Sequence, residues 1–374
     1  MNSRPTWAVV SLRILRSNFR HIQNFVGPKV TVCAIVKADA YGHGTVDCAR
    51  ALAAEGASWF GVTSTDEGVQ LRQAGISGRI LLMTSFWRGD EAAVTDHQLT
   101  PAVWSLEQLQ LLSAHCAGNA NVPVHLKVDT GMGRLGATLA ELPGLLKYLR
   151  SVPQLCLEGV LTHFASAEVI GAEDVEAQVN CFRTALSLVE KAGFSPKFVH
   201  TANSAAIVTR TDSWGNMVRP GVALYGYYPR FVGGEPEQVP AVEPVLSWKS
   251  RLISLRSVGS GQPLGYNGTY VTSRDSRIAV LPVGYADGLN RQLSSKGRVI
   301  VRGAYAPIVG KVSMDLTLID VTDIPGAAVG DEATLIGRSG ELGISAYDHA
   351  DAASTIPYEI LCNISKRVPR RYSD

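Results

Sequence analysis

The segment Val32-Cys-Ala-Ile-Val-Lys-Ala-Asp-Ala-Tyr-Gly-His-Gly44 opens with five apolar residues and then changes to small and polar ones. A short apolar run bounded by glycine-rich sequence is typical of a buried strand. Similar runs recur over the first 240 residues, mostly separated by segments with helical spacing. This alternation predicts a parallel sheet with helices in the connections. The predicted strands are Val30–Val36, Trp59–Val62, Ile80–Met83, Leu99–Val103, Val124–Val128, Leu157–Leu161, Phe198–His200 and Met217–Val218.

Helix signals lie between these strands. Ser64 and Ser105 each precede a helical pattern as a predicted N-cap. The amphipathic segment Ala172–Gly193 stops at a glycine, as helices often do. Eight predicted strands favour closure into a barrel over an open sheet. We therefore predict an α/β fold, a (β/α)8 TIM barrel, for this part of the chain.

The pattern changes after Tyr228. Gly233–Pro240 is rich in glycine and proline, which is typical of a linker or surface loop, and the helical patterns disappear beyond Val242. We predict a barrel over residues 1–242, with the segment before Ser11 able to pair with the second domain, and a C-terminal all-β domain over residues 243–374. Its predicted strands are Leu246–Val258, Ile278–Val283, Arg298–Val301, Pro307–Val312, Leu316–Val321 and Glu332–Ile336.

Composition narrows the class of protein. The 374 residues are 46% hydrophobic and 18% charged, which excludes intrinsic disorder and a coiled coil. Lys and Arg number 35 against 33 Asp and Glu, a net charge of +2 that does not favour nucleic-acid binding. Arginines interrupt the N-terminal segment, and no apolar run is long enough for a membrane span. We expect a cytoplasmic protein with reduced cysteines and no metal site, because the six cysteines lack metal-ligand spacing.

Polar residues that directly follow the predicted strands are the candidate site residues, because the loops of a barrel converge at the C-terminal ends of its strands. A lysine and an arginine stand at opposite ends of this series, with a histidine between them in the sequence. The candidate residues are Lys37, Asp129, Arg134, His163, the segment Thr201-Ala-Asn-Ser204, and Arg219.

Each candidate also has an ordinary structural interpretation. Lys37 is either a solvated lysine or a desolvated nucleophile of the kind that forms Schiff bases, and its position favours the second. Asn203 begins a helix after a strand, where it either caps the helix or leaves backbone N–H groups for a phosphate. Gly221 permits close approach of an anion or simply a turn. His163 is equally compatible with a core histidine, and His125, inside a strand, is interpreted as structural.

Several segments together resemble one family. Val36-Lys-Ala-Asp-Ala-Tyr-Gly-His-Gly44 is similar to the pyridoxal-phosphate attachment signature of alanine racemases, the barrel-type (fold type III) pyridoxal-phosphate enzymes. The other matching segments occur in the family's order along both predicted domains. They begin at Arg4, Lys127, Thr162, His200, Met217, Leu281, Gly310, Tyr358 and Arg367.

The resemblance implies roles for particular residues. Lys37 would carry pyridoxal 5'-phosphate as an internal aldimine, His163 would lie against its ring, and Arg219 would face the pyridine nitrogen. Arg134 would meet the ring hydroxyl and the substrate carboxylate, and Lys127 is carbamylated in many members. The further cofactor-binding positions, most of them around the phosphate, are Tyr41, Asn203, Ser204, Gly221, Val222 and Tyr358.

The resemblance also implies a shared active site. Tyr266 would enter the site of a partner subunit as a second catalytic base, and the backbone N–H of Met314 would bind the substrate carboxylate. A homodimer follows from this arrangement. Gly265 and Asn267 depart from the serine and glycine that commonly flank the tyrosine, which leaves Tyr270 as an alternative.

These residues suit racemisation of alanine, which in the family supplies D-alanine for peptidoglycan. A proton must leave one face of the substrate and return to the other, so two bases are needed. We predict that Lys37 handles the proton of D-alanine and Tyr266 that of L-alanine. An arginine at the pyridine nitrogen keeps its own proton, so the ring is a weaker electron sink and side reactions are suppressed.

Three alternatives remain open. A racemase of broader specificity would also accept serine, although Ile356 and Tyr358, which narrow the pocket in the family, favour alanine. A barrel decarboxylase of basic amino acids would place an acidic residue where Arg219 stands. A non-catalytic pyridoxal-phosphate-binding barrel would lack residues 243–374.

Overall fold

A computed structural model describes residues 4–116 and 121–374. The described chain divides into two compact units. The barrel unit comprises residues 15–40 and 45–242, and the β unit comprises the residues up to Ile14, Tyr41–Gly44 and Glu243–Asp374. The chain therefore leaves the β unit to build the barrel unit and returns to the β unit near residue 243.

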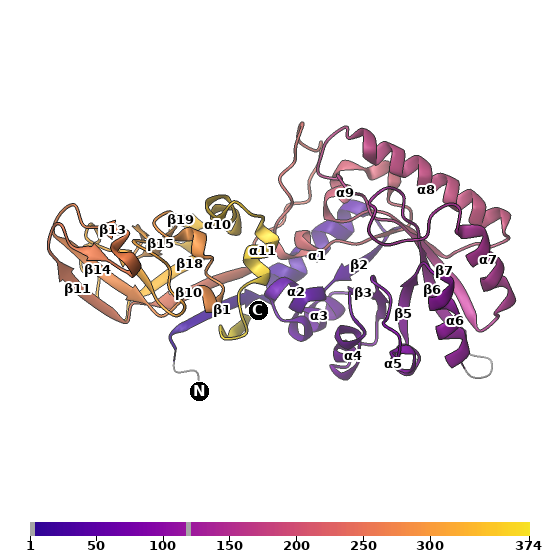
Figure 1. Ribbon diagram of the computed structural model, residues 1–374, viewed down its shortest axis with the longest axis horizontal. Helices are drawn as coiled ribbons and strands as arrows, with labels where there is room; N and C mark the ends of the chain where they lie inside the picture. The colour runs from indigo at the N-terminus through magenta and orange to yellow at the C-terminus, as the bar shows by residue number, and fades with distance from the viewer. Residues whose placement is uncertain (1–3, 117–120) are drawn as a thin grey trace. The chain divides into compact units, whose positions relative to one another are not determined.

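The barrel unit contains a sheet of eight parallel strands (Figure 1). Neighbouring strands pair in the order β8-β7-β6-β5-β4-β3-β2-β9. The remaining gap, between β8 and β9, is bridged by hydrogen bonds such as that from Asn216 N to Val199 O at 3.0 Å. The predicted (β/α)8 barrel is therefore confirmed. Its strands are β2 (Thr31–Ile35), β3 (Trp59–Val62), β4 (Arg79–Leu82), β5 (Leu99–Val103), β6 (Val122–Lys127), β7 (Leu155–Leu161), β8 (Phe198–His200) and β9 (Met217–Val218).

Helices connect the strands and lie outside them in Figure 1. Ser64 and Ser105 each form a reciprocal capping box, with Glu67 and Gln108, which confirms both predicted helix starts. The helices are α1 (Leu12–Val26), α3 (Thr45–Ala54), α4 (Thr65–Gln73), α5 (Glu91–Asp96), α6 (Leu106–His115), α7 (Leu142–Ser151), α8 (Glu173–Lys191) and α9 (Ser204–Thr209).

The β unit is built from sheets that join distant parts of the chain. A seven-stranded sheet contains both β1 (Thr6–Ser11) and β20 (Arg370–Ser373), which pair directly with each other. A three-stranded sheet contributes Ile278 to a small core that also contains Leu264 and Val309. The other strands are β10 (Leu246–Arg251), β11 (Ser254–Val258), β12 (Pro263–Leu264), β13 (Tyr270–Val271), β14 (Ser276–Leu281), β15 (Arg298–Val301), β16 (Ala304–Pro307), β17 (Thr317–Asp320), β18 (Glu332–Ser339) and β19 (Leu342–Ile344).

Two short helices of the β unit, α10 (Ala346–Ala353) and α11 (Pro357–Cys362), were not expected from the strand pattern. Both have local start signals: Ser345 forms a capping box with Asp348, and Pro357 occupies the first turn of α11. Each is too short for its apolar spacing to stand out against the neighbouring strands.

Within residues 4–116 and 121–374, no helix is long and apolar enough to cross a membrane. Over the same ranges, no three or more His, Cys, Asp or Glu side chains gather in a way that would hold a metal ion.

Candidate functional site

The C-terminal ends of the barrel strands bring together five of the predicted site residues. Lys37 follows β2, Lys127 ends β6, Arg134 lies in the loop after β6, His163 follows β7, and Arg219 follows β9. The charges of all four basic residues act on the His163 ring and lower its pKa. The five side chains therefore form one electrostatic cluster, although they come from distant parts of the sequence.

Arg219 is held firmly at this end of the barrel. Its side chain is buried, and its Nη2 donates to the carbonyl oxygens of Thr162 at 2.8 Å and Thr201 at 3.0 Å. Its Nη1 lies 2.9 Å from Nδ1 of His200, and its Nη2 lies 3.4 Å from Nδ1 of His163. Burial lowers the pKa of Arg219 to about 10, so the guanidinium keeps its proton near neutral pH.

His163 is neutral in this setting. Burial is the main cause that lowers its pKa to about 3, and the charge of Arg219 is the next. A guanidinium can only donate, so its position beside Nδ1 favours the proton of His163 on Nε2. His163 therefore adds no further positive charge to the cluster.

Lys127 is a buried amine whose pKa falls to about 8. Burial is the largest cause, followed by the charges of Arg219 and Arg134. The ammonium donates to the carbonyl oxygen of Met83 at 3.3 Å and lies 5.8 Å from the centre of the Trp104 ring. Near pH 8 a substantial fraction of Lys127 is thus the free amine, which is the reactive form.

The start of α9 and the loop after β9 form a second part of the barrel site. The Ser204 hydroxyl oxygen accepts from the backbone N–H groups of Gly221 at 2.9 Å and Ala223 at 3.3 Å, which leaves its own O–H to donate elsewhere. Val222 begins the short 3-10 helix Val222–Tyr225 in the same loop. Asn203 caps α9, because its Oδ1 accepts from Ala206 N at 3.0 Å.

Lys37 stands at the start of a left-handed turn, α2 (Lys37–Gly42). Ala38, Asp39, Ala40 and Tyr41 all have φ between +52° and +54°. Left-handed backbone costs a non-glycine residue roughly 1–2 kcal/mol, so surrounding contacts must hold this turn in place. Ala38 N donates to Glu67 Oε1 at 2.7 Å, and Thr45 N donates to Asp39 Oδ1 at 3.0 Å. Such strain is characteristic of functional positions and supports the special role expected for Lys37.

Tyr41 and Tyr358, the two predicted phosphate-binding tyrosines, both belong to the β unit. Their ring centres lie 6.2 Å apart. Burial raises the pKa of the Tyr41 hydroxyl above its usual range, so this hydroxyl remains protonated and able to donate.

Tyr266 and Met314 present large side chains to solvent in the single chain, with 67% and 53% of their surfaces exposed. Tyr266 begins the 3-10 turn Tyr266–Gly268, in which Asn267 has φ of +62° and Gly265 has φ of +70°. Asparagine tolerates left-handed backbone better than most residues, so Asn267 can replace a glycine after the tyrosine without disturbing the turn. The unusual flanks are therefore compatible with the assignment of Tyr266.

The sequence pattern assigned no functional role to two buried histidines next to Arg219 and to one another, His200 and His125. His200 lies between Arg219 and His125, with His125 Nδ1 and His200 Nε2 only 2.8 Å apart. His125 lies within strand β6, as expected of a structural residue, but it is also the next residue in a series of polar contacts that begins at Arg219. One signal is Gly159, which pairs with His125 across β6 and β7 and leaves space for its ring.

Comparison with known proteins places this geometry in a family. The protein-family model described as "Alanine racemase, N-terminal domain" matches residues 10–229, and the family model described as "Alanine racemase, C-terminal domain" matches residues 245–372. The chain belongs to the alanine racemase family.

Relatives in this family cover the whole chain. The alanine racemase of Halothermothrix orenii is 42% identical over 100% of this chain and 98% of its own length. That of Geobacter sulfurreducens is 41% identical over 100% of this chain and 98% of its own length. The crystal structure of the alanine racemase from Bacillus anthracis with bound L-Ala-P has 38% identity and a TM-score of 0.93, and the match covers 99% of this chain and 95% of that one.

Proposed function

We propose that this protein interconverts L-alanine and D-alanine with pyridoxal 5'-phosphate and supplies D-alanine for peptidoglycan. The observation that carries the proposal is the cluster of Lys37, Lys127, Arg134 and Arg219 around a neutral His163 at the end of the barrel. The names of relatives that match the full chain support the same reaction. The Bacillus anthracis structure, with its bound L-Ala-P, supports an amino-acid-like substrate.

The residues present fit a cofactor that carries a phosphate and an aromatic ring. Four basic side chains acting on one partly buried histidine favour an anionic occupant. The Ser204 hydroxyl has a hydrogen to donate, and the loop at Gly221 and Val222 lies beside it. We propose that these three residues bind the phosphate. Asn203 contributes by fixing the first turn of α9, since its side chain caps that helix.

When bound, pyridoxal phosphate supplies an electron-withdrawing ring that acidifies the α-hydrogen of an amino acid. Arg219 would face the ring nitrogen, and because its pKa remains about 10 it keeps its own proton. His163, neutral and beside Arg219, would pack against the ring. This arrangement moderates the electron withdrawal and favours return of a proton over decarboxylation.

Two proton carriers complete the proposal. Lys37 would hold or remove the α-proton on the face used by D-alanine, and Tyr266 of a second copy would do so on the face used by L-alanine. Arg134 and the backbone N–H of Met314 would bind the substrate carboxylate. The high exposure of Tyr266 and Met314 in the single chain supports burial of both residues against another copy. A homodimer and a cytoplasmic location are parts of the same proposal.

The decisive experiment incubates the purified protein and added pyridoxal phosphate with L-alanine in heavy water. We expect the optical rotation to fall to zero while deuterium replaces the α-proton. Release of carbon dioxide from a basic amino acid in a parallel incubation would instead identify a decarboxylase. If neither reaction occurs, the chain is a binding protein. A parallel incubation with L-serine separates an alanine racemase from one of broader specificity.

A further inference from the structure

Four polar side chains form a continuous line through the interior of the barrel. Arg219 Nη1 lies 2.9 Å from His200 Nδ1, and His200 Nε2 lies 2.8 Å from His125 Nδ1. His125 Nε2 has no partner within hydrogen-bond distance among the described residues, and the carboxylate oxygen Oε2 of Glu158 lies 3.6 Å from it. Both histidines are completely buried. The line therefore joins the guanidinium at the C-terminal end of the strands to a carboxylate on β7.

The chemistry of the two ends fixes the direction of every contact between them. A guanidinium can only donate, so His200 Nδ1 must accept and His200 Nε2 must carry the hydrogen. His125 Nδ1 then accepts that hydrogen, and His125 Nε2 carries its own toward Glu158. A carboxylate can only accept, so it completes the line without conflict. Both histidines are neutral in this scheme, and burial lowers the pKa of each in agreement with it.

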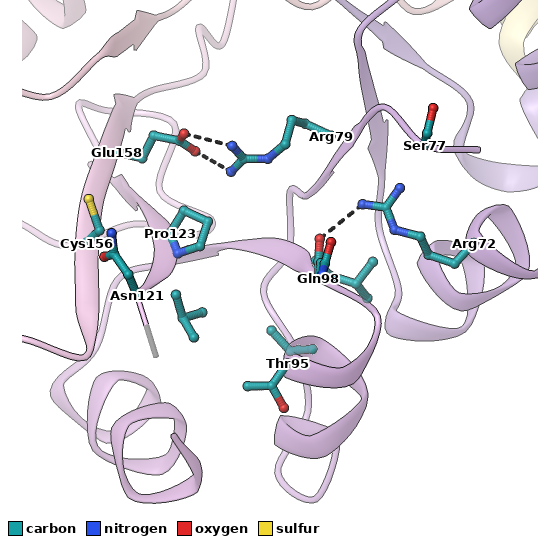
Figure 2. A pocket seen from close by; sticks show the side chains of 12 residues that line it. Arg72, Ser77, Arg79, Thr95, Gln98, Asn121, Pro123, Cys156 and Glu158 are labelled. Atoms are coloured by element: carbon teal, nitrogen blue, oxygen red, sulfur yellow. Dashed lines mark hydrogen bonds and ion pairs between the residues drawn. The ribbon is translucent and has the colours of Figure 1, made fainter. Parts of the chain in front are cut away.

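Glu158 is anchored where solvent can approach it. Its carboxylate receives two hydrogen bonds from Arg79, Nη1 to Oε1 at 2.9 Å and Nη2 to Oε2 at 2.6 Å. Figure 2 shows this pair in the wall of a cavity of about 460 Å³. The first residues of β4, β5 and β6 line the same cavity, so it lies at the N-terminal ends of the strands, opposite Lys37.

The Arg79–Glu158 pair is itself held in position. The Arg79 guanidinium stacks 4.8 Å from the centre of the Trp59 ring and also donates to Thr100 Oγ1 at 3.0 Å. Burial raises the pKa of Glu158, but the nearby His125 ring and the hydrogen bonds from Arg79 outweigh burial and leave the pKa below its usual value. Near neutral pH Glu158 is therefore ionised, and its carboxylate can only accept hydrogen bonds.

We propose that Glu158 is a positioning residue for the racemase site: it fixes both buried histidines in the Nε2–H tautomer and so keeps an acceptor nitrogen directed at Arg219. This inference rests on the proposed function only for the effect on catalysis, since the tautomers themselves follow from the contacts. Without the carboxylate, the His125 Nε2–H has no fixed acceptor, and the Nδ1–H tautomer becomes accessible. Two Nδ1–H tautomers would turn an N–H of His200 toward the guanidinium and displace Arg219.

The tautomers are measured by ¹⁵N NMR of the histidine side chains in the full-length protein loaded with pyridoxal phosphate. We expect Nε2–H for both His125 and His200 in the native chain. Glu158→Leu should mix or reverse the two tautomers, whereas Glu158→Gln should retain them because its amide oxygen still accepts from His125. Ser77→Ala removes an exposed hydroxyl from the same cavity and serves as the matched control.

The kinetic consequence is measured in parallel. Loss of the partner behind a ligand-binding residue typically costs ten-fold or more, so we expect Glu158→Leu to reduce kcat about ten-fold with little change in KM for alanine. Glu158→Gln should recover most of the rate, and Ser77→Ala should match the native protein. The absorption band of the bound cofactor should shift in Glu158→Leu alone.

Two outcomes would overturn the inference. One is an Nδ1–H tautomer at His200 in the native protein, which needs no variant to be observed. The other is a folded Glu158→Leu protein with unchanged tautomers, absorption and kcat. If Glu158→Leu does not fold, altered tautomers in Glu158→Gln would overturn the inference instead. A protein with the expected tautomers but no racemisation would refute the proposed function and leave the tautomer assignment standing.

Discussion

Replacement of Gly159 by alanine tests whether the interior of the barrel is built around His125. A Cβ atom at Gly159 would lie 2.6 Å from His125 Nδ1 and 2.7 Å from its Cε1 and Cγ atoms. Carbon contacts in proteins are about 3.5–4.0 Å, so the ring would have to move by roughly 1 Å. The His125 ring has little freedom to move, because it is buried, hydrogen-bonded to His200, and in contact with the rings of Trp59 and Phe198.

The expected cost follows from these contacts. Overpacking of a closely packed core costs about 1–3 kcal/mol, and a lost buried hydrogen bond adds about 1 kcal/mol. We therefore expect Gly159→Ala to lower the free energy of unfolding by about 2–4 kcal/mol. Urea unfolding followed by circular dichroism measures this change, with the native and variant proteins in the same concentration of pyridoxal phosphate.

Gly144→Ala is the matched control for this experiment. Gly144 lies in α7, and nothing lies within 4 Å of a Cβ built there. Alanine in a helix is about 0.5–1 kcal/mol more favourable than glycine, so this variant should be slightly more stable than the native chain. Gly159→Ala with native or increased stability would refute the argument that His125 needs this space.

Further predictions concern the two proposed bases, the buried lysine and the buried histidines. Lys37→Ala should abolish the visible absorption of lysine-bound pyridoxal phosphate together with activity, because no other residue is proposed to hold the cofactor covalently. Tyr266→Phe should keep that absorption but slow α-proton exchange from L-alanine more than from D-alanine. Each site would use Lys37 of one copy and Tyr266 of the other. When Lys37→Ala and Tyr266→Phe proteins are mixed and exchange subunits, the mixed dimers should therefore recover about a quarter of the native activity. Lys127, with a pKa of about 8, should bind ¹³C-labelled carbon dioxide as a carbamate whose ¹³C NMR signal grows between pH 6 and 9. The urea midpoint should fall as the pH is lowered from about 6.5 toward 4. In the folded chain the pKa of His163 is about 3 and that of His349 about 4, whereas in the unfolded chain both are about 6.5. The unfolded chain therefore takes up protons first, and acid favours unfolding.

Each of these predictions has a contradicting result. Retained visible absorption in Lys37→Ala would remove that residue from its proposed role. Equal losses for the two alanine enantiomers in Tyr266→Phe would argue against the assignment of faces, and an inactive mixture of exchanged subunits would argue against a shared site. A carbamate signal that persists in Lys127→Arg would arise from another amine. A urea midpoint that stays constant down to pH 4 would show that the buried histidines do not govern acid stability.

The barrel strands were predictable because buried parallel strands are continuous apolar runs. Trp59–Val62, Leu99–Val103, Phe198–His200 and Met217–Val218 have the bounds predicted for them. The strand ends then directed attention to Lys37 and to the other basic residues near His163, since a barrel places those ends together.

What the sequence pattern missed depends on contacts between distant residues. His200 and His125 are 75 positions apart, and only the folded barrel joins them. The left-handed turn after Lys37 contains two alanines, an aspartate and a tyrosine. Of these only aspartate tolerates left-handed backbone, so local propensity gives little sign of the turn. The pairing of β1 with β20 is likewise invisible to any local pattern.

That pairing of β1 with β20 also constrains the order in which the chain can fold during synthesis. Every described strand of the barrel unit has been made by residue 218, whereas β1 must wait for β10 and for β20, both of which follow the barrel strands in the chain. We expect the barrel to fold first while β1 remains without its partners. In a nascent chain truncated before β10, the barrel should therefore be protected from proteolysis, whereas β1 should be open to cleavage.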